Sequence, residues 1–228
     1  MNPSDVFPLR GLYAISDGPR DDLLDACAAA LDGGAAILQY RDKTTDSERR
    51  SHEVRALQAL CARHRVPLII NDDIELAIRS GAAGVHLGED DGAIASARAR
   101  LGADAIIGAS CYDSLDRAQA MAAAGADYLA FGAFFPSPTK PFADTRAKGR
   151  PSTGGFSNFA RHATLQLLSD AQPLGLPLVA IGGITVDNAR SLIDAGADAV
   201  AVISALFGAR DVRAAARRFV ALFEAARS

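Results

Sequence analysis

Charged side chains that suit the binding of a diphosphate and a metal ion stand at particular places in the sequence. The cations Arg41, Lys43 and Lys140 each follow a short apolar run, and so do the carboxylates Asp72 and Asp91. Magnesium takes one or two carboxylates, keeps several waters, and completes its shell with phosphate oxygens of a substrate. Carboxylates beside cations therefore indicate a metal-bound diphosphate, if the fold brings them together. Taken alone, either aspartate could instead cap the helix that follows it.

A second set of residues suits a phosphate held by the backbone rather than by charged side chains. Gly182 and Gly183 follow an apolar run and allow another group to approach the chain closely, and Ile203 and Ser204 stand where a further turn begins. Barrel proteins often bind phosphate between two such turns, near the start of a short helix. A tight glycine turn without a ligand is the alternative. Two separate anion sites indicate two phosphorylated substrates, or one substrate phosphorylated at both ends.

The element that must position these residues is repeated, and in it a glycine and a small residue precede a short apolar run. The glycine suits the left-handed residue that ends a helix, and the apolar run suits a strand buried on both faces. Five copies of the pattern begin at Gly34, Gly81, Gly102, Gly125 and Gly196. Three further runs, which lack the glycine and bring the expected strands to eight, are Leu12 to Ser16, Leu68 to Asn71 and Leu178 to Gly182.

Helices alternate with the expected strands, so the strands should be parallel and joined by right-handed crossovers. Eight such units in 228 residues predict an α/β protein with a single (β/α)8 barrel, residues 1–228. A doubly wound open sheet is the rival, but its glycine-rich phosphate motif is missing after the first run, at residues 16–20. In a barrel, the carboxyl ends of the strands open onto one mouth, where the polar residues would meet.

Local signals set the expected helix boundaries. Thr45 with the glutamate three residues later predicts a capping box, and Asp113 and Thr185 are expected to cap two later helices. Residues 211–227 carry apolar side chains at helical spacing and should form the last helix.

The connection from about 134 to 159, between the sixth strand and its helix, is long and rich in Pro, Gly, Ser and Thr. That length is typical of a lid or of an irregular insertion.

Composition and charge restrict the class of protein. With 24 basic and 27 acidic residues, the chain lacks the cationic field on which nucleic-acid binders rely. No apolar stretch is long enough for a membrane span, and Met1 to Arg10 does not look like a signal peptide. Cys27, Cys61 and Cys111 match no zinc-binding spacing and suit a reducing compartment. We therefore expect a cytoplasmic protein that binds neither nucleic acid nor membrane, with a homo-oligomer left open.

Six motifs, in order along the chain, resemble those of the thiamine phosphate synthase family. They are QYRDK at Gln39–Lys43, INDD at Ile70–Asp73, GVHLGEDD at Gly84–Asp91, IGAS at Ile107–Ser110, FGAFFPSPTK at Phe131–Lys140 and AIGGIT at Ala180–Thr185. The likeness extends from Leu12 to about Phe207, and it too implies a (β/α)8 barrel. One departure is the connection that follows Lys140, which is longer than the family pattern.

The resemblance implies a reaction between two small phosphorylated heterocycles. A pyrimidine diphosphate, 4-amino-2-methyl-5-(diphosphooxymethyl)pyrimidine, is joined to a thiazole phosphate, 4-methyl-5-(2-phosphoethyl)thiazole or its carboxylated form, to give thiamine phosphate and diphosphate. In the family the carbon–oxygen bond of the pyrimidine substrate breaks first, and the thiazole nitrogen then captures the methylene cation. Mg²⁺ and cationic side chains stabilise the charge that accumulates on the departing diphosphate. This chemistry requires no side-chain nucleophile.

Carried over motif by motif, the resemblance implies three groups of site residues. The pyrimidine diphosphate would be held by Gln39, Arg41, Lys43, Asn71, Ser110 and Lys140, of which Arg41, Lys43 and Lys140 would act in catalysis. Mg²⁺ would be bound by Asp72 and Asp91, and the thiazole phosphate would be held by Ser137, Thr139, Gly183, Ile203 and Ser204. His86 could line the pyrimidine pocket or only fill the barrel.

Three other functions share parts of this pattern. A thiazole tautomerase is a similar barrel that binds no diphosphate, so the cations with Asp72 and Asp91 argue against it. A phosphosugar isomerase or aldolase would share the phosphate site, but a Schiff-base aldolase needs a lysine at a strand end. A non-catalytic barrel that binds phosphorylated ligands would not need the metal carboxylates. Mg²⁺-dependent release of diphosphate separates these functions.

Overall fold

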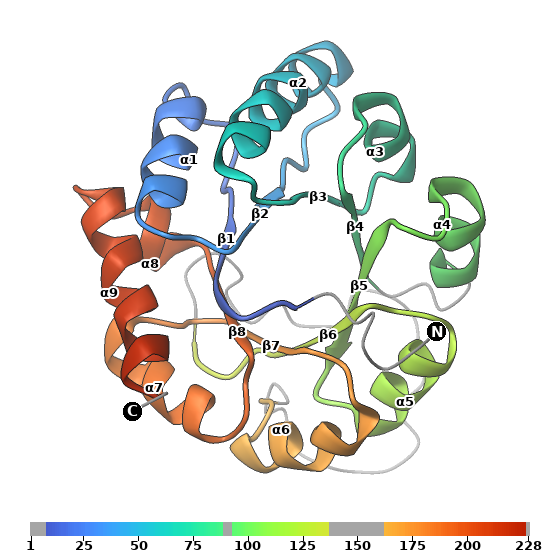
Figure 1. The fold of residues 1–228 in the computed structure, drawn as a ribbon, viewed down its shortest axis with the longest axis vertical. Coiled ribbons are helices and arrows are strands. Elements are labelled where there is room, and N and C mark those ends of the chain that lie inside the picture. Colours follow the sequence, from blue (N-terminus) through green and yellow to red (C-terminus); the bar gives the residue numbers. More distant parts are fainter. Residues whose placement is uncertain (1–7, 89–92, 137–161, 227–228) are drawn as a thin grey trace, which may run out of the picture.

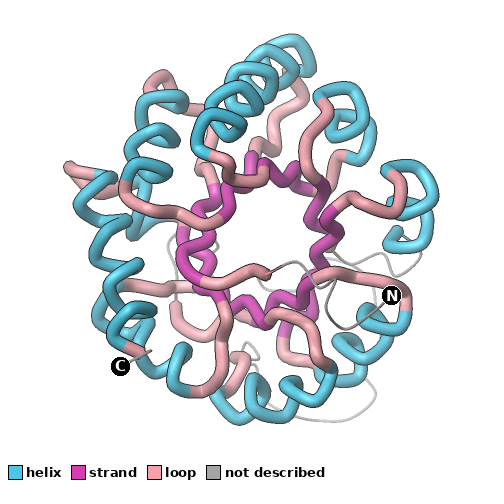
Figure 2. The backbone as a smooth tube through the Cα atoms, viewed as in Figure 1, coloured by secondary structure: helices cyan, strands magenta, loops and turns pink. Residues whose placement is uncertain are grey.

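Eight parallel strands form a closed barrel in the order β1 to β8, with the helices in a ring outside it (Figure 1, Figure 2). The structure is a computed structural model that describes residues 8–88, 93–136 and 162–226. The strands are β1 Gly11–Ile15, β2 Ile37–Tyr40, β3 Leu68–Asn71, β4 Gly84–Leu87, β5 Ile106–Tyr112, β6 Tyr128–Phe131, β7 Leu178–Ile181 and β8 Ala199–Val202. The barrel expected from the repeated apolar runs is thereby confirmed.

The helices alternate with the strands and cover the outside of the barrel. They are α1 Leu23–Asp32, α2 Ser47–His64, α3 Ile74–Ser80, α4 Ala93–Leu101, α5 Leu115–Ala123, α6 Leu165–Ala171 with the 3-10 turn η3 Gln172–Leu174, α7 Val186–Asp194, α8 Ser204–Phe207 and α9 Val212–Ala225. The last helix, α9, buries Ala216, Phe219 and Phe223 and packs on α1 and β1. It therefore has the apolar face expected for residues 211–227.

Two of the three expected helix caps are wrong by one residue. The carboxylate of Asp46, and not Thr45, accepts a hydrogen bond from the first turn of α2. The hydroxyl of Ser114, and not Asp113, caps α5 in the same way. In both cases the chain leaves the preceding loop one residue later than expected, so the adjacent polar side chain reaches the free amides. Thr185 is the N-cap of α7, as predicted.

Successive side chains along each strand point alternately into two buried clusters. In β1, Tyr13 and Ile15 lie inside the barrel, whereas Leu12 and Ala14 pack between the sheet and the helices. Residues paired across neighbouring strands face the same side, so Gln39, which pairs with Ile15, also faces the interior. The register thus decides which polar side chains enter the barrel and which lie under the helices.

The end of β5 carries a bulge. Ser110 pairs with Ala130 and Tyr112 pairs with Phe131, so two residues of β5 stand opposite one residue of β6. Tyr112 has a left-handed φ of 55°, and the guanidinium of Arg117 lies 5.6 Å from the centre of its ring. Since Phe131 belongs to the outer cluster, the bulge turns Tyr112 toward α5 instead of into the barrel.

The long connection expected at about 134–159 lies between β6 and α6, and its residues 137–161 fall outside the described part of the chain. Its expected role as a lid or insertion stays a prediction. None of the helices in the described ranges combines the length and the apolar character needed to cross a membrane.

Candidate active site

Gln39 faces the inside of the barrel near the end of β2. Its side chain is only 2% exposed, and its Nε2 donates a hydrogen bond to the hydroxyl of Tyr13 at 2.7 Å. Burial of an amide is costly unless its polar atoms are paired, so this contact fixes how the side chain is held. The structure places Gln39 at the base of the mouth, and its predicted contact with a substrate stays a prediction.

Arg41 and Lys43 follow β2 on the rim of the barrel, with Arg41 half-buried and Lys43 exposed. The backbone N–H of Arg41 donates to the buried hydroxyl of Ser16 at the end of β1, at 2.9 Å. Within the described residues, neither the guanidinium of Arg41 nor the ammonium of Lys43 forms an ion pair with a carboxylate. Two positive charges without a compensating carboxylate make this part of the rim attractive to an anion.

Asp42, between these two cations, turns the opposite way and is fully buried. Its carboxylate pairs with Arg49 of α2 at 2.6 Å and accepts a hydrogen bond from the backbone N–H of Thr44 at 2.8 Å. The same guanidinium pairs with Glu53, which accepts a hydrogen bond from the hydroxyl of Tyr40. Burial alone would raise the pKa of Asp42, but the hydrogen bonds from Thr44 and Arg49 outweigh it and lower that pKa. No local pattern in the sequence predicts this buried clamp of Asp42, Arg49 and Glu53.

Asn71 is the last residue of β3 and pairs with His86 of β4, and Asp72 directly follows it. Asn71 Nδ2 donates to Asp72 Oδ2 at 2.6 Å, and Asp72 has a left-handed φ of 61°. A Cβ added to Gly88 would lie 3.7 Å from Asp72 Oδ1, so the chain that leads from β4 to Asp91 starts next to this carboxylate. The neighbouring Asp73 caps α3, accepting from the backbone of Leu76, which is the role that suits an aspartate in this position.

The donor set at Asp72 fits a magnesium ion. It offers a carboxylate next to an amide oxygen, and Mg²⁺ takes one or two carboxylates and completes its shell with waters and substrate phosphate oxygens. No cluster of three or more His, Cys, Asp or Glu side chains suited to a metal is found in the described parts of the chain. The second expected ligand, Asp91, lies outside those parts, so the pairing of Asp72 with Asp91 stays a prediction.

Ser110 faces the inside of the barrel at the end of β5, and His86 lies beside it on β4. His86 Nε2 is 2.9 Å from Ser110 Oγ, and His86 Nδ1 is 3.0 Å from the hydroxyl of Tyr128. Two roles are open for His86 from the sequence, lining the pyrimidine pocket or filling the barrel. Its contacts with Ser110 and Tyr128 are those of a side chain that fills the barrel. The imidazole is nevertheless in contact with a predicted substrate-binding residue.

The glycine pair after β7 packs against the loop after β6. Gly182 and Gly183 have left-handed φ values of 102° and 63°, and a Cβ on Gly183 would lie 2.3 Å from the carbonyl oxygen of Pro136. Only glycine allows this backbone conformation and this close approach together. Ile203 is the N-cap of α8, and Ser204 is its first residue. The turns after β7 and β8 are neighbours because these two strands pair.

Four predicted site residues lie outside the described part of the chain. They are Asp91, Ser137, Thr139 and Lys140. Their roles stay predictions. The described ones, in contrast, all stand at the carboxyl ends of the strands, as the barrel requires: Gln39, Arg41, Lys43, Asn71, Asp72, Ser110, Gly183, Ile203 and Ser204.

Three residues that support the site were missed in the sequence. Tyr13 and Tyr128 face each other inside the barrel with their hydroxyl oxygens 2.7 Å apart. Arg117 of α5 donates from Nε to the carbonyl of Ser110 at 2.7 Å and from its other end to the carbonyl of Gly88. Alternation along the strands could have placed the tyrosines inside, but no local signal says that they meet.

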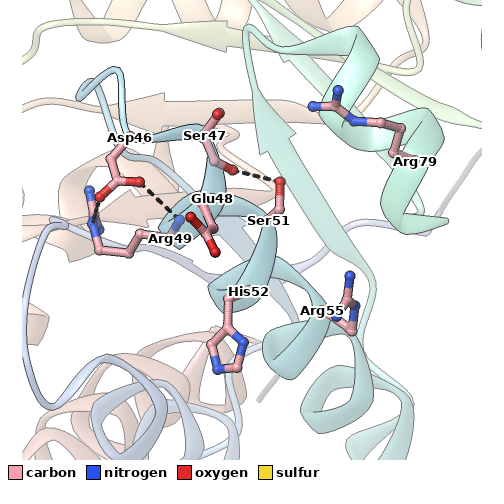
Figure 3. A pocket seen from close by; sticks show the side chains of 8 residues that line it. All are labelled: Asp46, Ser47, Glu48, Arg49, Ser51, His52, Arg55 and Arg79. Carbon is pink, nitrogen blue, oxygen red and sulfur yellow. Dashed lines mark hydrogen bonds and ion pairs between the residues drawn. The ribbon is translucent and has the colours of Figure 1, made fainter.

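A hollow on the outside of the barrel contains none of the predicted site residues. It lies between the start of α2 and α3, and Figure 3 shows the side chains that line it. Two of its polar side chains form local hydrogen bonds at the start of α2: Asp46 accepts from the backbone of Arg49, and Ser51 donates to the carbonyl of Ser47. Because the polar residues that follow the strands meet at the mouth of the barrel, the mouth is the better candidate for chemistry.

The three cysteines are buried and unpaired with one another. Burial raises the pKa of each thiol to about 12, and Cys111 also donates to the carbonyl of Ala109 at 3.6 Å. A thiol with such a pKa is not a nucleophile at neutral pH. Cys111, next to Ser110, is thus part of the core under the helices.

The sequence and the fold are similar to those of enzymes that make thiamine phosphate. A family model described as thiamine monophosphate synthase matches residues 12–206. A thiamine-phosphate synthase from Chromobacterium violaceum is 52% identical over 219 residues, covering 95% of this chain and 98% of that protein. Another, from Methylobacillus flagellatus, is 51% identical over 225 residues, covering 98% of this chain and 100% of that protein.

A solved structure gives the same result for the fold. The thiamine phosphate pyrophosphorylase from Pyrococcus furiosus superposes with a TM-score of 0.79 at 30% sequence identity. The match covers 96% of this chain and 97% of that one. Likeness in sequence and likeness in fold therefore extend over almost the whole chain.

Proposed function

The chain belongs to the thiamine monophosphate synthase family and is a transferase that makes thiamine phosphate, and we propose that its two substrates bind on opposite sides of the barrel mouth. The pyrimidine diphosphate lies over the ends of β2 to β5. The thiazole phosphate, carboxylated or not, lies over the ends of β7 and β8. The reacting atoms then meet above the centre of the barrel.

On the first side, the proposed contacts to the pyrimidine diphosphate come from charged and amide groups. Arg41 and Lys43 offer positive charge that no described carboxylate compensates, and Lys140 is proposed to add a third cation. Gln39 and Asn71 supply amides, and Ser110 supplies a hydroxyl. The full set of residues proposed to contact the pyrimidine diphosphate is thus Gln39, Arg41, Lys43, Asn71, Ser110 and Lys140.

Mg²⁺ is proposed to bind between Asp72 and Asp91. The support is the carboxylate of Asp72, held by Asn71 at the rim and close to the chain that leads to Asp91. When bound, the ion would supply positive charge to the oxygens of the diphosphate and help to orient them. The cations of the rim would share that task.

On the second side, the proposed contacts to the thiazole phosphate come mainly from the backbone. Gly183, Ile203 and Ser204 stand on two adjacent turns, and Gly183 has no side chain to obstruct a phosphate. Ser137 and Thr139 are proposed to add hydroxyl groups from the connection after β6. Backbone N–H groups at such turns donate to phosphate oxygens without needing a charged side chain.

The proposed reaction breaks the bond between the methylene carbon of the pyrimidine and the diphosphate oxygen. The electron pair of that bond leaves with the diphosphate, and the thiazole nitrogen supplies the pair for the new carbon–nitrogen bond. Negative charge grows on the leaving group, so Arg41, Lys43 and Lys140 stabilise the transition state more than the ground state. No side-chain nucleophile takes part, in agreement with the buried thiol of Cys111.

The observation that carries the proposal is the uncompensated pair Arg41 and Lys43 on the same rim as Asp72. The test is to incubate the protein with both substrates and Mg²⁺, and to measure thiamine phosphate and diphosphate. Asp72→Ala should lower kcat about 100-fold, as removal of a metal ligand does for charge stabilisation. Asp73→Asn is the matched control, since asparagine also caps a helix and should leave the rate unchanged.

The alternatives give different results in the same assay. Conversion of the thiazole phosphate alone, without release of diphosphate, would indicate a thiazole tautomerase. Binding of the phosphorylated compounds without turnover would indicate a non-catalytic barrel. Full activity in Asp72→Ala would contradict the proposed metal site. A cytoplasmic location and a homo-oligomeric state stay predictions from the sequence.

A further inference from the structure

A chain of polar side chains crosses the inside of the barrel from β2 to β5. Gln39 Nε2 donates to the Tyr13 hydroxyl at 2.7 Å, which lies 2.7 Å from the Tyr128 hydroxyl. Tyr128 in turn lies 3.0 Å from His86 Nδ1, and His86 Nε2 lies 2.9 Å from Ser110 Oγ. The chain therefore joins two proposed substrate-binding residues, Gln39 and Ser110, through Tyr13, Tyr128 and His86.

The barrel is built to hold these rings. The Tyr128 ring stacks on the imidazole of His86, with the centres 5.6 Å apart and the planes 19° apart. It meets the Tyr13 ring edge-on, at 5.8 Å and 75°. A Cβ on Gly108 would lie 2.0 Å from the Tyr128 ring, so the absence of a side chain at Gly108 makes the space for it. The geometry of the chain is thus set by packing as well as by hydrogen bonds.

Gln39 sets the direction of the hydrogen bonds. Its NH₂ group can only donate, so the Tyr13 oxygen accepts from it, and Tyr13 uses its own hydrogen toward Tyr128. Tyr128 then donates to His86 Nδ1, which places the ring hydrogen on Nε2. If the hydrogen bonds instead ran from Ser110 toward Tyr13, the Tyr13 oxygen would accept from both Gln39 and Tyr128. The hydroxyl hydrogen of Tyr13, which is buried, would then have no acceptor among the five side chains.

It follows that Ser110 Oγ accepts a hydrogen bond from His86 Nε2 and keeps its own hydrogen for another partner. Ser110 and His86 are half-buried, whereas Gln39, Tyr13 and Tyr128 are buried. Tyr13 is 1% exposed and Tyr128 0%. Burial raises the pKa of both phenols well above the ordinary value, so neither becomes a phenolate, which would reverse the direction.

We propose that Tyr13, Tyr128 and His86 are positioning residues that hold Ser110 as a hydrogen-bond donor toward an acceptor atom of the pyrimidine diphosphate. The proposal rests on the substrate side proposed above for Ser110. A serine whose hydrogen is free can donate it to a substrate atom that has a lone pair, such as a ring nitrogen or a phosphate oxygen. Gln39 contributes by starting the chain on the opposite wall.

Two substitutions of His86 separate this role from simple filling of the barrel. In His86→Gln the amide nitrogen can take the place of Nε2 and still donate to Ser110. In His86→Asn the shorter amide can meet only Tyr128. We expect KM for the pyrimidine diphosphate to rise about tenfold in His86→Asn and to stay within about twofold in His86→Gln. KM for the thiazole phosphate should not change in either, nor should any constant in the control His52→Asn, an exposed histidine of α2.

A double-substitution cycle tests whether His86 acts through Ser110. Ser110→Ala should raise KM for the pyrimidine diphosphate about as much as His86→Asn does, and the double variant should be no worse than either. Effects that multiply would overturn the proposal, and so would an unchanged KM in Ser110→Ala. Absence of thiamine phosphate with the wild-type protein would instead overturn the proposed function, and this inference with it.

A measurement on the wild-type protein does not depend on how the variants fold. Nitrogen-15 NMR of labelled imidazoles at neutral pH distinguishes a protonated ring nitrogen from a bare one. We expect His86 to carry hydrogen on Nε2 and none on Nδ1. A hydrogen on Nδ1, in a neutral or a charged ring, would overturn the proposed direction.

Discussion

At the ends of β2 and β3 the mouth of the barrel presents charged side chains, whereas at the ends of β7 and β8 it presents glycine and backbone. On the first side, side chains below the rim fix the chain: the hydroxyl of Ser16 accepts a hydrogen bond from the backbone N–H of Arg41, and Arg49 forms an ion pair with the adjacent Asp42. On the second side, the shape comes from Gly182 and Gly183, packed on the loop after β6. The two proposed phosphate-binding regions of the mouth are thus built by different physical means.

The difference has a chemical meaning for the proposed reaction. The diphosphate leaves with more charge than it had in the substrate, so its side needs full positive charges that act in the transition state. The thiazole phosphate keeps its charge throughout and needs only to be held in place, for which backbone N–H groups suffice. Substitutions on the two sides should therefore change different kinetic constants.

The largest expected effect is the loss of a rim cation. Arg41→Ala should lower kcat/KM for the pyrimidine diphosphate about 100-fold or more, because a charge that stabilises the leaving group is gone. KM for the thiazole phosphate should stay the same. Steady-state kinetics with each substrate varied in turn would measure both, with the exposed Arg55→Ala of α2 as control. An equal loss for both substrates would remove the distinction between the two sides.

The second-largest expected effect is on stability, and it comes from the buried ion pair of Asp42 and Arg49. Asp42→Asn should lower the free energy of unfolding at pH 7 by about 2 to 3 kcal/mol, because Arg49 loses a buried partner. The pKa of Asp42 is lowered in the folded protein, so its contribution is present above the unfolded value of about 4 and is lost as the pH falls below it.

Urea unfolding of wild type and Asp42→Asn between pH 7 and pH 3 would measure this difference. The two curves should converge at low pH. The exposed pair of Arg190 and Asp194 offers a control, in which Asp194→Asn should cost less than about 1 kcal/mol. A difference that grows as the pH falls would contradict the lowered pKa.

A smaller effect is expected on the glycine side. Gly183→Ala should raise KM for the thiazole phosphate about tenfold and leave that for the pyrimidine diphosphate unchanged, because a Cβ would push away the loop at Pro136. Gly81→Ala is a matched control: its φ of 65° is close to the 63° of Gly183, but an added Cβ would meet nothing within 4 Å. Both variants should lose about 1 kcal/mol of stability from the backbone conformation. Equal kinetics in the two would show that the close approach has no functional role.

The smallest effect should come from salt. Raising the ionic strength from about 0.05 M to about 0.5 M at constant Mg²⁺ shortens the screening length, which weakens attraction to exposed charges such as Lys43. We expect KM for the pyrimidine diphosphate to rise several-fold and that for the thiazole phosphate to rise less. The reverse order would indicate that the second side also depends on charged side chains.

Much of the fold could be predicted because its signal is local and repeated. Each strand is a short apolar run, often introduced by a glycine with a left-handed φ, as at Gly125 and Gly196. Helix starts were less certain, because Thr45 and Asp46, or Asp113 and Ser114, are adjacent candidates with the same chemistry. Which of them caps depends on where the loop ends, and the loop is shaped by the whole barrel.

The rim residues could be predicted from their place after the strands, but the groups that hold them could not. Tyr13 and Tyr128 are 115 residues apart in sequence and meet only because β1 and β6 close into one barrel. Asp42 stands between two rim cations in the sequence, and nothing local says that it turns away from them toward Arg49. Contacts across the barrel need the closed structure, whereas positions along one strand need only its alternation.

The bulge at the end of β5 shows how much one residue of length can decide. With strict alternation, Tyr112 would follow Ser110 into the barrel and its ring would stand over the serine. The extra residue places it opposite Phe131 and against Arg117 instead. The space over Ser110 therefore depends on the length of the chain at the end of β5 as well as on its chemistry.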